Sequence, residues 1–119
     1  MPRVREGGEA MSKSQREKGK RGEREVANIL RDAGYSDARR GVQYHGGPSS
    51  PDVVGLAGIH LEVKRTEKCE AYKFLEQAED DSDEGEIPVV VHRQNGKEWI
   101  AILPFEDFLK LYGKAEETS

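Results

Sequence analysis

The stretch of sequence that decides the fold is PDVVGLAGIHLEVK, residues 51–64. It predicts two short β-strands joined by a tight turn, for which Gly58 supplies the backbone freedom. Side chains alternate between the faces of a strand, so Glu62 and Lys64 point to the same face. If the hairpin closes normally, Asp52 lies within reach of the same point. The stretch therefore predicts two carboxylates and an ammonium group at the end of a sheet.

Such a group of side chains can bind a divalent metal ion, and the lysine can orient a water molecule or offset charge that develops during a reaction. Leu61 and Val63, on the opposite face of the same strand, are expected in the core. Charged pairs are also common on solvated strand faces, so the spacing alone is compatible with an ordinary surface. A site is favoured because Glu62-Val63-Lys64 is the one place in this sequence with a lysine two residues after an acid.

The composition indicates one small domain without a membrane segment. The chain has 119 residues, of which 35% are charged and 34% hydrophobic, so its core must be small. No apolar run approaches membrane-spanning length, and the start lacks the apolar block of a secretory signal. The single Cys69 excludes an intrachain disulfide and a multi-cysteine zinc site. A reducing, cytoplasmic location is therefore expected.

The charges are segregated along the chain. Residues 1–44 carry 11 Lys and Arg against 7 Asp and Glu, whereas residues 76–119 carry 4 against 12, within a net charge of −4. The basic part is suited to a polyanion while the acidic part stays in water. A solvated surface without a partner would give the same pattern.

The expected domain spans residues 14–113, between a flexible tail at 1–13 and a frayed end at 114–119. Ser14 followed by Glu17 fits a capping box that opens a helix. The apolar stripe of this helix consists of Val26, Ile29, Leu30 and Ala33, and Gly34 stops it.

The same stripe, extended backwards at helical spacing, reaches Glu23. An acid on a core-facing stripe is costly unless it is paired or functional. A glutamate that only reaches water at the helix end, or meets a lysine, is the alternative.

The remaining expected elements are a strand at 38–44, a loop at 45–50, a helix at 70–80, two strands at 88–93 and 97–103 around an Asn-Gly turn, and a final helix opened by Pro104. The acidic segment 80–86 lacks the ligand spacing of a calcium loop. His60 and His92 are expected to be ordinary exposed or half-buried strand residues. The order α-β-β-β-α-β-β-α indicates a mixed α/β domain with helices packed over one central sheet.

The final helix has an apolar stripe at i, i+3, i+4 and i+7, with Gly113 as its expected stop. The stripe consists of Phe105, Phe108, Leu109 and Tyr112. Packing on the sheet is the favoured use of this stripe, and a contact with a second copy is the alternative.

These residues resemble the PD-(D/E)XK nuclease superfamily, and within it the small Holliday junction resolvases of archaea and phages. Residues 18–24 resemble the opening helix with its acid, Pro51-Asp52 and Glu62-Val63-Lys64 resemble the defining motif, and Glu76-Gln77-Ala78 resembles the following helix. The likeness covers roughly residues 14–112. It implies a restriction-endonuclease-like αβββαβ core, with a central mixed sheet flanked by helices and an extra C-terminal strand and helix.

The resemblance also implies a magnesium-dependent phosphodiesterase acting on DNA. Asp52, Glu62 and the backbone carbonyl of Val63 would hold Mg²⁺, with Glu23 joining directly or through water, and Mn²⁺ would substitute. Lys64 would orient the attacking water or offset charge in the transition state. These implied catalytic residues are Glu23, Asp52, Glu62 and Lys64.

The implied partner is branched double-stranded DNA, four-way junctions in particular, and the implied oligomer is a homodimer. The protein is expected in the cytoplasm of a bacterial or archaeal cell, where a virus of that cell is a possible source of its gene. The implied DNA contacts are Lys18, Lys20, Arg21, Arg24, Arg39, Arg40, Arg65, Gln77 and, in the loop before Asp52, His45. Two alternatives stay open. One is a related phage nuclease that cuts flaps or other branched DNA, and the other is a DNA-binding module that has lost catalysis on the same fold.

Overall fold

A computed structural model of the chain describes residues 12–41 and 51–118. Its elements are α1 (Lys13–Asp32), β1 (Arg39–Arg40), β2 (Val53–Val54), β3 (Ile59–Arg65), α2 (Ala71–Asp81), β4 (Ile87–Arg93), β5 (Ile100–Ile102) and α3 (Phe105–Glu117). This order confirms the predicted α-β-β-β-α-β-β-α succession. The end of the first predicted strand and the loop with His45 lie outside the described residues.

The strands form one five-stranded mixed sheet in the order β1-β2-β3-β4-β5. β2 and β3 are antiparallel across a turn in which Gly58 has φ +79°, as predicted. β3 and β4 are parallel over seven residue pairs, and α2 forms the crossover between them. The architecture agrees with a restriction-endonuclease-like core.

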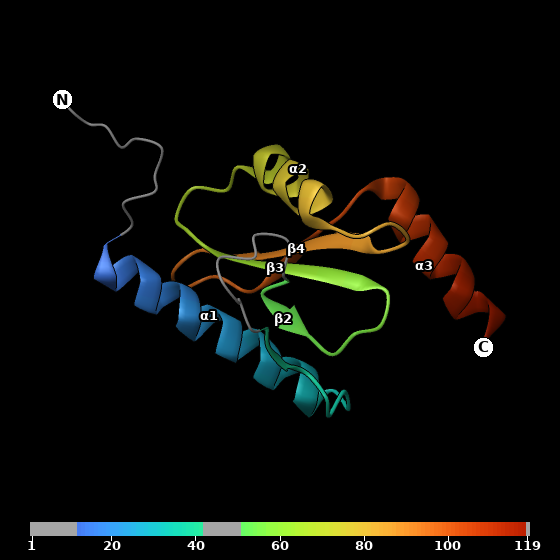
Figure 1. The fold of residues 1–119 in the computed structure, drawn as a ribbon, viewed down its shortest axis with the longest axis horizontal. Coiled ribbons are helices and arrows are strands. Elements are labelled where there is room, and N and C mark those ends of the chain that lie inside the picture. The colour runs from blue at the N-terminus through green and yellow to red at the C-terminus, as the bar shows by residue number, and fades with distance from the viewer. Residues whose placement is uncertain (1–11, 42–50, 119) are drawn as a thin grey trace.

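The two faces of the sheet are covered by different helices (Figure 1), with α1 on one face and α2 on the other. The cluster on the α1 face consists of Val26, Ala27, Val53, Leu61, Val63 and Val89, and the smaller cluster on the α2 face consists of Phe74, Ala78 and Val90. The predicted burial of Leu61 and Val63 is confirmed. Among the described helices, none combines the length and apolar character needed to cross a membrane.

The start of α1 differs from the prediction. Ser12 is the N-cap: its hydroxyl accepts a hydrogen bond from the Gln15 N–H at 3.1 Å, and the Gln15 side chain accepts one from the Ser12 N–H at 2.9 Å. The capping-box spacing occurs twice in this sequence, and the pair starting at Ser14 is the wrong one. The stop at Gly34 agrees with its φ of +108°.

The buried face of α1 is also rotated from the predicted stripe. Ile29 and Ala33 are exposed, whereas Gly22, Val26 and Ala27 are buried. Val26 is buried as predicted, whereas Ala27 was not part of the predicted stripe. Small residues on the buried face permit close approach of the helix to the sheet.

α3 corrects two predictions. It runs through Gly113 to Glu117, because a glycine inside a helix costs only about 1 kcal/mol and good helix formers follow it. Its apolar stripe does not pack on the sheet. None of the residues of α3, all of which are described, is buried, and Figure 1 shows the helix at the end of the molecule next to the C-terminus.

Candidate active site

The candidate site forms at the edge of β3, next to the start of β2. The strands pair through Val53 and Leu61. Beside this pair, the Asp52 N–H donates to the Leu61 carbonyl, and the Asp52 carboxylate accepts from the Val63 N–H, both at 2.8 Å. The Asp52 carboxylate thus accepts the hydrogen bond from the Val63 N–H, which the backbone of a longer β2 would otherwise accept. Since the N–H and C=O of a strand residue point to the same side, the Val63 carbonyl faces this edge as well.

Glu62 is buried next to Asp52, and the two carboxylates act on each other. Burial is the main cause that raises the pKa of Asp52 to about 7, and the charge of Glu62 adds to it. Burial also raises the pKa of Glu62, although the charge of Lys64 opposes this shift. Two buried carboxylates therefore compete for the same proton when no cation neutralises them.

Lys64 is held above this strand face by α2. Its Nζ donates a hydrogen bond to Oε1 of Gln77 at 2.9 Å and lies 5.3 Å from the centre of the Phe74 ring. Both partners belong to α2, where Phe74 is buried and Gln77 is exposed. Gln77, which the resemblance implied as a DNA contact, thus contacts Lys64 directly, and its contact with DNA stays a prediction.

Glu23 approaches the same site from α1. Its charge contributes to the raised pKa values of both Asp52 and Glu62, and its Oε1 accepts a hydrogen bond from Arg40 Nε at 2.9 Å. The acid on the predicted stripe is thus paired, with an arginine rather than a lysine. Three carboxylates and a lysine, contributed by α1, the start of β2 and β3, are brought together.

His60 contradicts its prediction. The side chain is completely buried, with Nε2 at 2.7 Å from Glu62 Oε2 and Nδ1 at 3.7 Å from Glu86. One ligand atom each of His60, Glu62 and Asp81 lie within 4.8 Å of one another. The position of Asp81 near the site could have been found from the sequence, because it follows Gln77 by four residues, one helical turn along α2.

His92 is buried as well, so its prediction is also wrong. Its Nε2 lies 2.9 Å from the Thr66 carbonyl, and its ring centre lies 5.8 Å from that of Phe74. These contacts connect β4 to the chain after β3. His92 therefore supports the scaffold behind the site.

The donor atoms at the β3 edge fit a divalent metal ion. Carboxylate and carbonyl oxygens are the hard ligands that Mg²⁺ and Mn²⁺ accept. The raised pKa of Asp52 shows that its charged form is poorly compensated by the protein alone. A cation placed between the two acids would remove this penalty.

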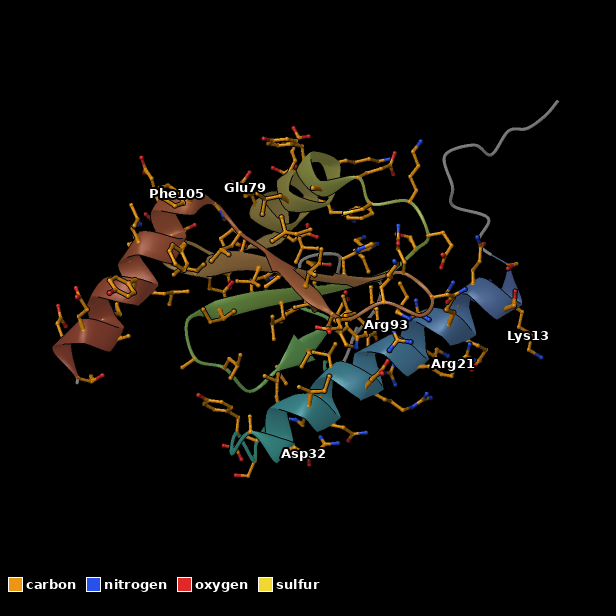
Figure 2. The ribbon with its side chains drawn as sticks, turned by 180° about the vertical axis from the view of Figure 1, so that it is seen from behind. Lys13, Arg21, Asp32, Glu79, Arg93 and Phe105 are labelled. Atoms are coloured by element: carbon orange, nitrogen blue, oxygen red, sulfur yellow. The ribbon has the colours of Figure 1, made fainter. Side chains whose placement is uncertain are left out.

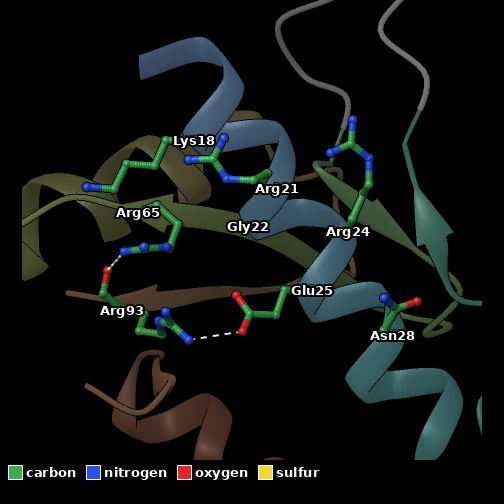
Figure 3. Close-up of a pocket in the computed structure, with 8 residues that line it drawn as sticks. All are labelled: Lys18, Arg21, Gly22, Arg24, Glu25, Asn28, Arg65 and Arg93. Carbon is green, nitrogen blue, oxygen red and sulfur yellow. Dashed lines mark hydrogen bonds and ion pairs between the residues drawn. The ribbon is translucent and has the colours of Figure 1, made fainter. Parts of the chain in front are cut away.

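A basic pocket of about 390 Å³ lies between α1 and the ends of β3 and β4 (Figure 3). It is lined by Lys18, Arg21, Gly22, Arg24, Glu25, Asn28, Arg65 and Arg93. The four basic residues of this set that precede β4 were predicted as phosphate contacts. Arg93 was not, because only the parallel pairing of β4 with β3 brings it beside Arg65.

Hydrogen bonds fix the floor of this basic pocket. Arg93 donates to Glu25 at 2.9 Å, and Arg65 donates to the Arg93 carbonyl at 3.0 Å and to Asn95 at 2.9 Å. A Cβ on Gly22 would lie 2.5 Å from Cγ of Arg65. Glycine at this position therefore lets the arginine pass under α1.

The other predicted DNA contacts lie elsewhere. Lys20 and Arg39 are exposed outside the basic pocket, and Arg40 is paired with Glu23. Gln77 contacts Lys64, and His45 lies outside the described residues. The predicted surface is thus divided between one formed pocket and scattered side chains.

Comparison with known proteins agrees with this geometry. The chain matches the family described as "Phage putative PDDEXK endonuclease" over residues 14–119. No curated protein matches it.

Proposed function

Because the chain belongs to this family of phage PD-(D/E)XK endonucleases, we propose that it is a Mg²⁺-dependent endodeoxyribonuclease that cuts branched DNA, most specifically a Holliday junction resolvase. The proposal is carried by one observation, the meeting of the Asp52 and Glu62 carboxylates at the β3 edge beside Lys64. The reaction is hydrolysis of a phosphodiester bond. Its proposed setting is the cytoplasm of an infected host cell.

Asp52, Glu62 and the Val63 carbonyl would hold the metal ion, and Glu23 would join directly or through water. Their support is the clustering of buried, mutually repelling carboxylates. Mn²⁺ accepts the same ligands and is expected to substitute for Mg²⁺. When bound, a divalent ion makes water a better nucleophile and neutralises charge on the scissile phosphate.

Lys64 would orient the attacking water or offset the charge that develops on the phosphate. Its hydrogen bond to Gln77 fixes the ammonium group, so little reorganisation is needed when substrate binds. Gln77 would thus act by positioning Lys64.

The basic pocket and the exposed Lys20 and Arg39 would contact DNA phosphates. Phosphate contacts position DNA without reading its bases, which favours recognition of DNA shape over sequence. A four-way junction is resolved by two symmetric nicks, whereas each copy of the domain would carry one catalytic site. A two-fold homodimer would supply both sites.

The test is cleavage of a substrate panel in Mg²⁺: a four-way junction, a flap, a linear duplex and a single strand of matched sequence. We expect paired nicks across the junction and slow cutting of the duplex. Equal cleavage of duplex and junction would contradict the branched-DNA proposal, and cutting of the flap alone would replace junctions by flaps as the substrate.

Variants test the site separately from the substrate. Asp52→Asn should abolish junction cleavage while retaining binding in Ca²⁺ or EDTA. Lys73→Ala removes an exposed lysine of α2 that pairs with Glu70 and serves as the matched control. Full activity in Asp52→Asn would remove the site assignment.

A further inference from the structure

One histidine and three acids gather where α2 ends beside β3. His60 and Glu62 belong to β3, Asp81 is the last residue of α2, and one ligand atom of each lies within 4.8 Å of the others. Glu86, which directly precedes β4, adds a carboxylate oxygen 3.7 Å from His60 Nδ1. We refer to these four residues as the His60 cluster.

The imidazole of His60 distinguishes this cluster from an ordinary acidic surface. The side chain is completely buried, and its Nε2 lies 2.7 Å from Glu62 Oε2. Its Nδ1 is turned towards Glu86 but has no hydrogen-bond partner among the described residues. A neutral imidazole has one N–H and one lone pair, so it can donate to only one of the two carboxylates and turns its lone pair towards the other.

A metal ion at Nε2 would remove this conflict. It would accept the Nε2 lone pair together with the oxygens of Glu62 and Asp81, and the ring N–H would then be at Nδ1, directed towards Glu86. A carboxylate behind the second ring nitrogen is the usual support of a metal-binding histidine. The carboxylate of Glu86 is itself held in place, because its Oε1 accepts a hydrogen bond from the Asp83 N–H at 2.8 Å.

The negative charge of the His60 cluster also calls for a cation. In the described part of the chain, no lysine or arginine forms an ion pair with Glu62, Asp81 or Glu86. Burial is the main cause of the raised pKa of Glu62, and the charge of Asp81 adds to it. Figure 2 shows α2, marked by Glu79, and α1, marked by Arg21, on opposite sides of the sheet, so the basic pocket beside α1 lies across the sheet from this cluster.

We propose that His60, Glu62 and Asp81 bind a divalent transition-metal ion, with Glu86 orienting the imidazole through Nδ1. This site goes beyond the proposed function, which places Mg²⁺ at the β3 edge with Asp52. The two sites share Glu62 alone. A carboxylate has two oxygens, so Glu62 can contact one ion on each side.

The ligand set selects the class of metal. Mg²⁺ prefers oxygen ligands and keeps several of its waters, whereas imidazole nitrogen suits first-row transition metals. One imidazole with two carboxylates therefore favours Mn²⁺ and Zn²⁺ over Mg²⁺, and Zn²⁺ should bind more tightly than Mn²⁺. Asp81 and Glu86 are half-buried rather than enclosed, so an ion can reach the cluster from solvent.

Electron paramagnetic resonance of Mn²⁺ bound to the full chain in excess Mg²⁺ tests the site. Mg²⁺ should displace Mn²⁺ from the oxygen ligands of the β3 edge and leave one Mn²⁺ per chain at the His60 cluster. The pulsed spectrum of this remaining ion should show coupling to an imidazole nitrogen. An ion held at the β3 edge has only oxygen ligands and should show none.

Variants assign the signal to the cluster. Glu86→Gln changes the partner of the imidazole and should weaken this Mn²⁺ binding about tenfold, and Asp81→Asn, which changes a ligand, should weaken it more. Asp80→Asn is the matched control, because it makes the same charge change at the adjacent, exposed residue of α2, and its Mn²⁺ affinity should be unchanged. Melting curves of the metal-free variants check that each is folded.

Complete displacement of Mn²⁺ by Mg²⁺, or a retained Mn²⁺ without nitrogen coupling, would overturn the site and leave His60 as a hydrogen-bond partner of Glu62. Equal losses in Asp81→Asn and Asp80→Asn would overturn it as well. Asp52→Asn should keep the nitrogen-coupled Mn²⁺, and its loss there would show that the two sites are one. Because the measurement is metal binding, a chain that cuts no DNA would contradict the proposed function and leave this site standing.

Discussion

The two faces of β3 have opposite characters. Towards α1 the strand presents Leu61 and Val63 to the larger apolar cluster. Towards α2 it presents His60, Glu62 and Lys64, of which the first two are buried. The same seven residues therefore contribute packing on one face and titratable groups on the other.

Within this one strand, the residues that stabilise the fold and the residues that could take part in a reaction therefore lie on opposite faces. Burial of the apolar side chains stabilises the fold by roughly 2 kcal/mol each. Burial of the acids has the opposite sign, since it raises the pKa values of Asp52 and Glu62. The apolar face thus supports a polar face that is destabilising until its charge is compensated.

The largest expected effect is on catalysis. Lys64→Ala should lower DNA cleavage at least about 10²-fold, because it removes the positioned ammonium group. The midpoint of thermal unfolding should change little, since this side chain is half-buried and is not part of either apolar cluster. Cleavage rates and melting curves measured on the same preparation check both. A large loss of stability in Lys64→Ala would show that the α2 face of β3 also stabilises the fold, which contradicts the distinction between the two faces.

Leu61→Ala should have the converse effect. Removal of this buried side chain should lower the free energy of unfolding by about 2–5 kcal/mol, as measured by urea denaturation. Below the unfolding transition, the cleavage rate per folded molecule in saturating Mg²⁺ should stay within a few-fold of the parent protein. If cleavage were lost while the chain is still folded, the α1 face would have a direct role in the chemistry.

Asp52→Asn should change the pH dependence of stability in EDTA. The folded-state pKa of about 7 lies above the ordinary value of 3.8, so the folded protein binds the extra proton. The protonated Asp52 therefore contributes fully to the free energy of unfolding below about pH 4, and this contribution is lost as the pH rises towards 7. We therefore expect Asp52→Asn to flatten this decline and to stabilise the metal-free protein by about 2 kcal/mol at pH 8.

Urea denaturation from pH 4 to pH 8 measures this slope. Glu62 shifts in the same direction, so some decline should remain in the variant. A parent protein whose stability is flat over this range would contradict the coupled, buried acids. Added Mg²⁺ should stabilise the parent protein at pH 8 and not Asp52→Asn.

The smallest expected effect compares two glycines of α1. Gly22→Ala places a Cβ against Arg65 and should weaken DNA binding a few-fold by displacing this side chain from the basic pocket. Gly19→Ala meets no atom within 4 Å and should stabilise the helix by up to about 1 kcal/mol without changing binding. DNA binding in Ca²⁺, measured by fluorescence anisotropy at several salt concentrations, separates the two. Equal DNA affinities of the Gly22→Ala and Gly19→Ala variants would show that Arg65 does not contact DNA.

The hairpin and its acids could be predicted because alternation along a strand is a local property. Asp52, Glu62 and Lys64 needed only the turn at Gly58 to meet. The burial of His60 could not be predicted in the same way. It depends on α2 crossing over β3, which covers the face that an isolated hairpin would leave in water.

The basic pocket shows the same limit. Lys18, Arg21 and Arg24 follow from one helix, whereas the contribution of Arg93 depends on parallel pairing with β3. The exposed face of α3 could not be decided either, because its apolar period fits a helix that packs on a sheet as well as one that binds a partner.

The crossover through α2 also fixes when the protein can become active during its synthesis. Glu23, Asp52, Glu62 and Lys64 have all been made before α2 and β4 leave the ribosome. Yet β3 gains its seven parallel pairs, and Lys64 its contact with Gln77, only from those later segments. We therefore expect a nascent chain ending near residue 70 to carry every acid and the lysine but to be unable to cut DNA, so that competence arrives with the second half of the domain.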